Sequence, residues 1–190
     1  MKQKIIDFFR NAYRLTLSKK GQLNCVWSDI KKFYKANEWK YSIIERDDLL
    51  VVQAVFRIDD HLFLQVDTIM RDNFVTLRST IPLKYADELA EDVFILATHL
   101  NNLFRHTKVC TYTESNEIDV SINIDYKVLL LDPSTNFYLL KLIYETAEDV
   151  HWVYKRLLET REAPALIFAE FLERLNTKEK EGESKSEWSR

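Results

Sequence analysis

The residue type that most restricts the chemistry of this sequence is glycine. The chain of 190 residues contains only two glycines, Gly21 and Gly182. A loop that binds the phosphates of a nucleotide needs several glycines, because its backbone must approach the phosphate oxygens closely. The sequence therefore excludes nucleotide sites of the Walker and Rossmann types.

The histidines and cysteines show no spacing typical of a metal centre or a catalytic group. The nearest approach to a metal site is a short turn with three potential ligands, Asp59, Asp60 and His61. A solvated hairpin turn explains the same residues, and we predict that they bind no metal. Cys25 and Cys110 are far apart and lie in no Cys-x-x-Cys pair, which predicts two reduced, packed thiols.

The carboxylates of the strand-like segments also lack a catalytic pattern. Asp67, Asp119 and Asp125 alternate with apolar residues, as side chains on the solvent side of a strand do. A pair that acts as acid and base would need one carboxylate removed from water, and the pattern predicts that all three are solvated. We therefore predict a protein that is not an enzyme and uses no cofactor.

Composition describes an ordinary globular protein. Hydrophobic residues make up 46% and charged residues 30% of the chain, and the net charge is −3. Basic and acidic residues are mixed along the sequence, which argues against a nucleic-acid-binding protein. No segment approaches the about 18 apolar residues that span a membrane, and charged residues interrupt residues 1–17, so no secretory leader is predicted. We expect a cytoplasmic protein without membrane contact.

Three apolar runs in the middle of the chain determine the fold class. Leu49–Ile58, His61–Met70 and Phe74–Ile81 are separated by only two or three polar residues, which allows antiparallel pairing alone. Trp39–Arg46 is predicted to precede this meander as a first strand, and 108–114 with 117–125 to form a second hairpin. Apolar spacing predicts helices at 3–17, 25–37, 83–104, 132–160 and 164–176. The sequence thus predicts an α+β fold, with the antiparallel meander and hairpin packed against long helices.

The predicted domain organisation is simple. Residues 1–176 form one domain, and residues 177–190, rich in Lys, Glu and Ser, form a disordered polar tail. Gly21, in the segment Ser18–Gly21, is expected to end the first helix in a left-handed conformation.

The second face of the meander carries more apolar residues than water favours. Five of them have the parity opposite to the core residues of their strands: Val51, Val55, Phe63, Ile69 and Phe74. A contiguous apolar patch of this kind is seldom exposed on a monomer. Helix 3–17, helix 164–176 or a second copy of the chain could cover it, so we predict that these residues form a partner or dimer surface.

The order of elements and some residues resemble the YbjN family of bacterial sensory transduction regulators. The matching stretches are Ile30 to Phe33 followed by 37–41 (Asn-Glu-Trp-Lys-Tyr), the helix end 99–103 with Asn101 and Asn102, and the hairpin 109–125 with the helix after Asp132. The resemblance covers residues 25–160. The sequence lacks the glycine that the family commonly has before the aromatic residue, and it adds helices at both ends.

The resemblance implies a fold like that of type III secretion chaperones and a non-enzymatic role. Proteins of this fold form homodimers and bind extended segments of partner proteins, so a homodimer with an unidentified protein partner is expected. An alternative is a sensor of a small molecule or anion, with a pocket between helix 83–104 and the sheet near Arg78 and Arg105. A hydrolase with an unrecognised site is the third hypothesis.

Overall fold

The structure, a computed structural model, describes residues 9, 11–46, 49–58, 62–71 and 73–187, with side chains up to residue 178. It contains one antiparallel sheet in the order β1-β2-β3-β4-β6-β5. Its strands are β1 (Tyr41–Arg46), β2 (Leu49–Arg57), β3 (Phe63–Met70), β4 (Phe74–Thr80), β5 (Lys108–Tyr112) and β6 (Glu117–Asp125). The predicted α+β class, with its meander and second hairpin, is confirmed.

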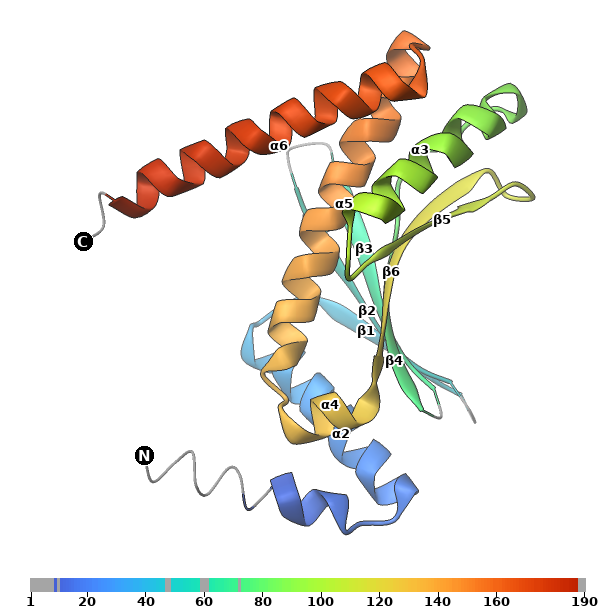
Figure 1. The fold of residues 1–190 in the computed structure, drawn as a ribbon. Helices are drawn as coiled ribbons and strands as arrows, with labels where there is room; N and C mark the ends of the chain where they lie inside the picture. The colour runs from blue at the N-terminus through green and yellow to red at the C-terminus, as the bar shows by residue number, and fades with distance from the viewer. Residues whose placement is uncertain (1–8, 10, 47–48, 59–61, 72, 188–190) are drawn as a thin grey trace.

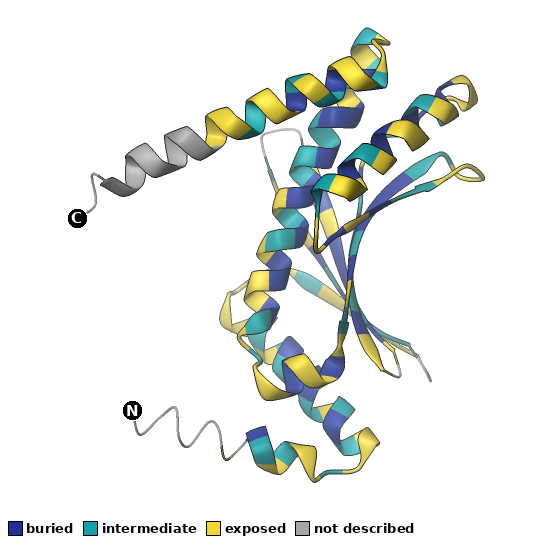
Figure 2. Ribbon diagram, viewed as in Figure 1, coloured by how far each residue is buried: buried dark blue, intermediate teal, exposed yellow. Residues whose placement is uncertain are grey.

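The helices with described bounds are α2 (Lys19–Ala36), α3 (Ala90–Leu103), α4 (Tyr126–Leu131), α5 (Thr135–Thr160) and α6 (Pro164–Glu187), with a short 3₁₀ helix, η1 (Asp87–Leu89), before α3. Residues 11–15, within the predicted helix 3–17, are also helical. Helices cover one side of the sheet (Figure 1). Helix α5 crosses β3, β4 and β6, and α3 packs along β5. Figure 2 shows buried residues along the side of α5 that faces the sheet.

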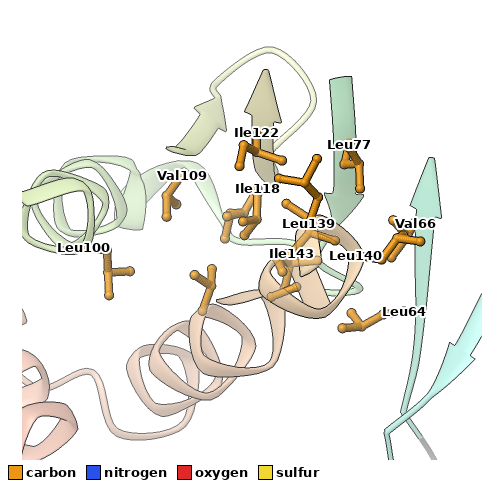
Figure 3. Packing of buried hydrophobic residues seen from close by; sticks show 14 of the residues in the cluster. Leu64, Val66, Leu77, Leu100, Val109, Ile118, Ile122, Leu139, Leu140 and Ile143 are labelled. Carbon is orange, nitrogen blue, oxygen red and sulfur yellow. The ribbon is translucent and has the colours of Figure 1, made fainter. Parts of the chain in front are cut away.

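Alternation along the strands explains the core. Leu64 and Val66 of β3 and Leu77 of β4 are fully buried, and they lie close to Leu139, Leu140 and Ile143 of α5 (Figure 3). On the other side of α5, Leu100 of α3 lies near Val109 and Ile118 of the second hairpin. One sheet face therefore forms the core with the helices, as the parity of these residues predicts.

The prediction that Gly21 ends a helix was wrong. Ser18 is the N-cap of α2, and its Oγ accepts a hydrogen bond from the Gly21 backbone N–H at 3.3 Å. Gly21 thus lies in the first turn of α2 and does not have a positive φ. Serine is a preferred N-cap because its side chain accepts a hydrogen bond from a free N–H of the first turn. With Ser18 as its N-cap, α2 begins at Lys19, six residues before the predicted start at residue 25.

Two other helices also begin later than the sequence predicts. The predicted helix 83–104 begins only at Asp87, because Ala86 is extended, and the predicted helix 132–160 begins at Thr135. The short helix α4 was not predicted. The Asp125 carboxylate caps α4 by accepting a hydrogen bond from the Lys127 N–H at 2.8 Å. Apolar spacing marks the middle of a helix, whereas polar caps mark its ends.

Helix α6 continues through Glu187, beyond residue 176, where the sequence predicts that a tail without regular structure begins. Lysine and glutamate have high helix propensity, so a chain rich in both can extend a helix that packing has already started. The Lys178 ammonium also lies 3.0 Å from the Asp149 carboxylate of α5.

None of the described helices combines the length and the apolar character needed to cross a lipid bilayer.

Candidate functional site

The sheet side that faces away from the helices is the candidate functional site, and we call it the outer face. The pairing register places all five predicted surface residues on it: Val51 is opposite Ile69, Val55 is opposite Gln65, and Phe63 is opposite Arg57. Phe74 is opposite Asp125 at the other end of the sheet. The register therefore agrees with the parity that the sequence analysis assigned to these residues.

The five side chains differ in exposure. Val55, Phe63 and Phe74 are 57%, 51% and 53% exposed, whereas Val51 is buried and Ile69 is half-buried. They also do not form one contiguous patch. Polar side chains cross the face between Val51, Ile69 and Phe74 on one side and Val55 and Phe63 on the other.

The described parts of both terminal segments lie elsewhere. Helix α6 packs against α3 and α5 on the helical side of the sheet. At the N-terminal end, Asn11 donates a hydrogen bond to the Leu131 carbonyl at 2.6 Å, and Arg14 forms a salt bridge with Asp29 of α2. These contacts hold the described N-terminal residues against α2 and α4. The sequence analysis considered that helix 3–17 or helix 164–176 could cover the outer face. The described residues of these two segments do not cover it.

A polar cluster occupies the middle of the outer face, formed by Gln53, Gln65, Asp67, Arg78 and Asp119. The Arg78 guanidinium lies 3.4 Å from the Asp67 carboxylate and 3.7 Å from the Asp119 carboxylate. Gln53 and Gln65 both donate hydrogen bonds to Oδ1 of Asp67, at 3.1 and 2.9 Å. The Arg78 guanidinium of β4 thus forms ion pairs with carboxylates on both neighbouring strands, β3 and β6.

The prediction that Asp67 and Asp119 are solvated was wrong. Their exposed fractions are only 7% and 4%, while Asp125 at the end of β6 is exposed as predicted. No helix covers them; long side chains on adjacent strands do. Burial raises the pKa of Asp119, against the opposing effects of a hydrogen bond with Thr80 and the charge of Arg78.

The arrangement fits a structural network better than a catalytic pair. Both carboxylates share the Arg78 guanidinium on a sheet surface, and the hollows found on the described part of the molecule are lined by other residues. Within the described residues, no group of three or more His, Cys, Asp and Glu side chains could bind a metal ion. The turn with Asp59, Asp60 and His61 lies outside the described residues, so its predicted lack of metal remains a prediction.

Of the hollows identified among the described residues, none is lined by both Arg78 and Arg105, near which the sequence predicts a pocket. Arg78 points from β4 to the outer face, where it pairs with Asp67 and Asp119, whereas α3 packs on the opposite face of the sheet. A hollow of about 470 Å³ does lie at the end of α3, beside Phe104, Arg105 and Lys108, but Arg78 is not among its lining residues.

The buried Asp119 leads to a test of pH dependence. A carboxyl group whose pKa is higher in the folded than in the unfolded state favours folding while it is protonated, and this contribution is lost as the pH rises. We expect Asp119→Asn to gain stability relative to wild type as the pH increases from about 4, near the ordinary pKa of aspartate, to neutral. Urea denaturation at several pH values measures this difference.

Asp125→Asn is the matched control for that experiment. It changes an exposed carboxylate on the same strand, and asparagine can replace aspartate as the N-cap of α4. Because this carboxylate is exposed, the variant should lack the rise in relative stability with pH that burial produces in Asp119→Asn. Parallel pH profiles for Asp119→Asn and wild type would contradict the burial of a charged Asp119.

Comparison of the sequence with models of known protein families gave no match, and comparison with curated proteins gave none either. The structural features of the chain are therefore the basis of any functional assignment.

Proposed function

We propose that this protein is a non-enzymatic protein-interaction domain that forms a homodimer through the outer face of its sheet. The observation that carries the proposal is the outer face itself, which the described chain leaves uncovered although it bears Val55, Phe63 and Phe74 more than half exposed. Aromatic side chains such as phenylalanine are enriched in protein–protein interfaces.

The arrangement of the face suits a second copy of the same chain. Phe63 precedes Asp67 by four residues on β3, and Phe74 precedes Arg78 by four residues on β4, where Asp67 and Arg78 are opposite each other. Because the strands are antiparallel, the two rings lie on opposite sides of this pair, each about 13 Å away at about 3.3 Å per residue. The face is therefore self-complementary about its centre.

A two-fold axis between two such faces makes use of this spacing. If the axis runs across the strands above the Asp67–Arg78 pair, Phe63 of one protomer meets the end of the sheet that carries Phe74 of the other. The same contact occurs at both ends, as an isologous interface requires. Asp67 and Arg78 of the two copies then lie close enough at the centre to exchange ion pairs, which would set the register of the dimer.

The resemblance to the YbjN family, with its fold like that of type III secretion chaperones, supports the same proposal from the sequence. It extends the proposal to a regulatory or chaperone-like role, in which the homodimer binds a partner protein in a bacterial cytoplasm.

Sedimentation equilibrium of the full chain tests the proposal directly. We expect a species with twice the mass of the 22.7 kDa chain at micromolar concentrations. The mass should depend little on salt concentration if apolar contacts dominate. A monomer throughout the concentration range would overturn the homodimer.

A further inference from the structure

A second feature of the molecule is the hollow at the loop that joins the end of α3 to the edge strand β5 (Figure 1). Its volume is about 470 Å³, and its lining residues include Phe104, Arg105, His106, Thr107, Lys108 and Val109. None of the residues that line it is acidic, although acidic residues outnumber basic ones in the chain as a whole. The charge of the hollow is therefore opposite in sign to that of the chain.

The cations of this hollow are not neutralised by the described part of the chain. The side chains of Arg105 and Lys108 are exposed, and neither forms a salt bridge or hydrogen bond with a described residue. By contrast, the guanidinium groups of Arg78, Arg156 and Arg174 each lie within 3.4 Å of a carboxylate. Arg105 and Lys108 are thus available to an anion from solution.

The dipole of α3 does not account for this charge. Arg105 follows the C-terminal end of the helix, where a cation interacts favourably with the free carbonyl groups. That helix end carries a partial charge of only about −0.5, whereas Arg105 and Lys108 bring two full positive charges. A net positive charge therefore remains at the hollow.

The wall of the hollow also contains a buried hydroxyl group. Thr107 is only 3% exposed, and its Oγ1 lies 3.5 Å from Oγ1 of Thr146 of α5, which is also buried. This distance is longer than the about 2.7–2.8 Å typical of hydroxyl pairs. The Thr107 hydroxyl thus has only a weak partner within the chain, and a ligand oxygen in the hollow would satisfy it better.

An apolar wall completes the hollow. The Phe104 ring is half-buried and meets Phe171 of α6 edge to face, with centroids 6.3 Å apart. Phe171 is fully buried, so it holds the Phe104 ring in place. The volume lies within the about 300–1,000 Å³ typical of small-molecule sites. A bare oxyanion would fill only part of such a hollow and would leave the surface of Phe104 without a contact.

We propose that this hollow binds a phosphomonoester of a small molecule, with the phosphate at Arg105, Thr107 and Lys108 and the organic part against Phe104. A phosphomonoester carries a charge of about −1.5 to −2 at neutral pH, which suits two unpaired cations better than a single carboxylate does. The guanidinium can donate two parallel hydrogen bonds to the phosphate oxygens, and the ammonium adds a second charge. Neither Phe63 nor Phe74 lines this hollow, so the proposal does not depend on dimer formation.

Titration of the full chain with three probes, followed by the backbone amide resonances in nuclear magnetic resonance spectra, tests the proposal. Phenyl phosphate carries both parts of the ligand, phenol only the ring and inorganic phosphate only the charge. We expect phenyl phosphate to bind about tenfold more tightly than phenol, because two exposed ion pairs are lost. It should bind about fivefold more tightly than inorganic phosphate, which lacks the apolar contact.

The resonances of residues 104–110 should shift most with phenyl phosphate. Phenol that binds as tightly as phenyl phosphate would overturn the assigned charge recognition. Inorganic phosphate that binds equally well would overturn the assignment of an ester. Shifts spread evenly over lysines and arginines elsewhere in the chain would show non-specific binding and overturn the site.

The double variant Arg105→Gln, Lys108→Gln locates the phosphate. It should weaken the binding of phenyl phosphate about tenfold and leave that of phenol unchanged, because it removes two partly screened charges. Lys40→Gln, Arg46→Gln is the matched control, since it removes one exposed lysine and one exposed arginine at β1, the opposite edge of the sheet. Equal weakening by the two double variants would show that the overall charge attracts phosphate and would overturn the site.

Thr107→Val tests the buried hydroxyl group with a nearly isosteric side chain. It should weaken the binding of phenyl phosphate and inorganic phosphate about threefold, the size of one hydrogen bond, and leave phenol binding unchanged. Urea denaturation of the variant separates a loss of binding from a loss of stability. Unchanged phosphate binding in a variant as stable as wild type would contradict the assigned role of Thr107.

Discussion

The double variant Phe63→Ser, Phe74→Ser is expected to be a monomer at concentrations where the wild-type chain is a dimer. Both rings are about half exposed in the single chain, so a dimer interface would bury the remaining half of each. Each ring would then contribute about 1 kcal/mol of apolar transfer free energy, and a dimer contains four of them. We expect a dissociation constant about a thousandfold higher, which corresponds to about 4 kcal/mol.

The same variant should keep the fold of the protomer. Substitution of exposed side chains that make few contacts within the chain usually changes stability by less than about 0.5 kcal/mol each. Sedimentation equilibrium measures the mass and circular dichroism the thermal unfolding; loss of the dimer lowers the unfolding temperature only through mass action. A double variant that remains dimeric would place the interface on another surface.

Phe94→Ser provides the matched control for this experiment. Phe94 is 66% exposed, more than either ring on the outer face, but it belongs to α3 on the helical side of the sheet. The variant removes the same chemical group and should stay dimeric. If Phe94→Ser also dissociates the dimer, association depends on exposed apolar side chains in general. The outer face would then not be the specific dimer interface.

Strand positions and parity could be predicted because each strand carries its own signal. Alternation placed Leu64, Val66 and Leu77 in the core and Phe63 and Phe74 on the other face before any contact was known. Helix ends were less predictable, because they depend on single polar residues such as Ser18 and Asp125, which also occur often in loops.

The polar cluster of the outer face could not be predicted from any one strand. Asp67 and Asp119 both alternate with apolar residues as solvated carboxylates would, and only the pairing of β4 with both β3 and β6 puts Arg78 between them. This pairing depends on the strand order, in which β6 lies next to β4 and β5 lies at the edge. The burial of Asp119 is therefore a property of the sheet and not of its local sequence.

Asn101 and Asn102, near the C-terminal end of α3, have different environments in the structure. The Asn101 side chain accepts a hydrogen bond from the Val109 backbone N–H at 2.7 Å and donates one to the Val109 carbonyl at 2.9 Å. The Asn101 side chain thereby links α3 to the edge strand β5, with the same pair of hydrogen bonds that the backbone of a neighbouring strand would form with Val109. Val109 is buried, so its backbone groups have limited access to replacement water.

Asn101→Ala is therefore expected to destabilise the protein by about 2 kcal/mol, since it removes two hydrogen bonds and leaves two backbone groups without partners. Asn102→Ala, at an exposed position on the same turn, should change the free energy of unfolding by less than about 0.5 kcal/mol. Urea denaturation of both variants measures the difference.

Asn101→Asp separates hydrogen bonding from the loss of side-chain volume. The carboxylate can still accept a hydrogen bond from the Val109 N–H, but it cannot donate to the Val109 carbonyl and places a like partial charge against it. We expect this nearly isosteric variant to be destabilised at neutral pH by at least as much as Asn101→Ala. If Asn101→Asp is as stable as wild type, the paired hydrogen bonds do not hold α3 to the sheet, and the apolar contacts between Leu100 and its neighbours suffice.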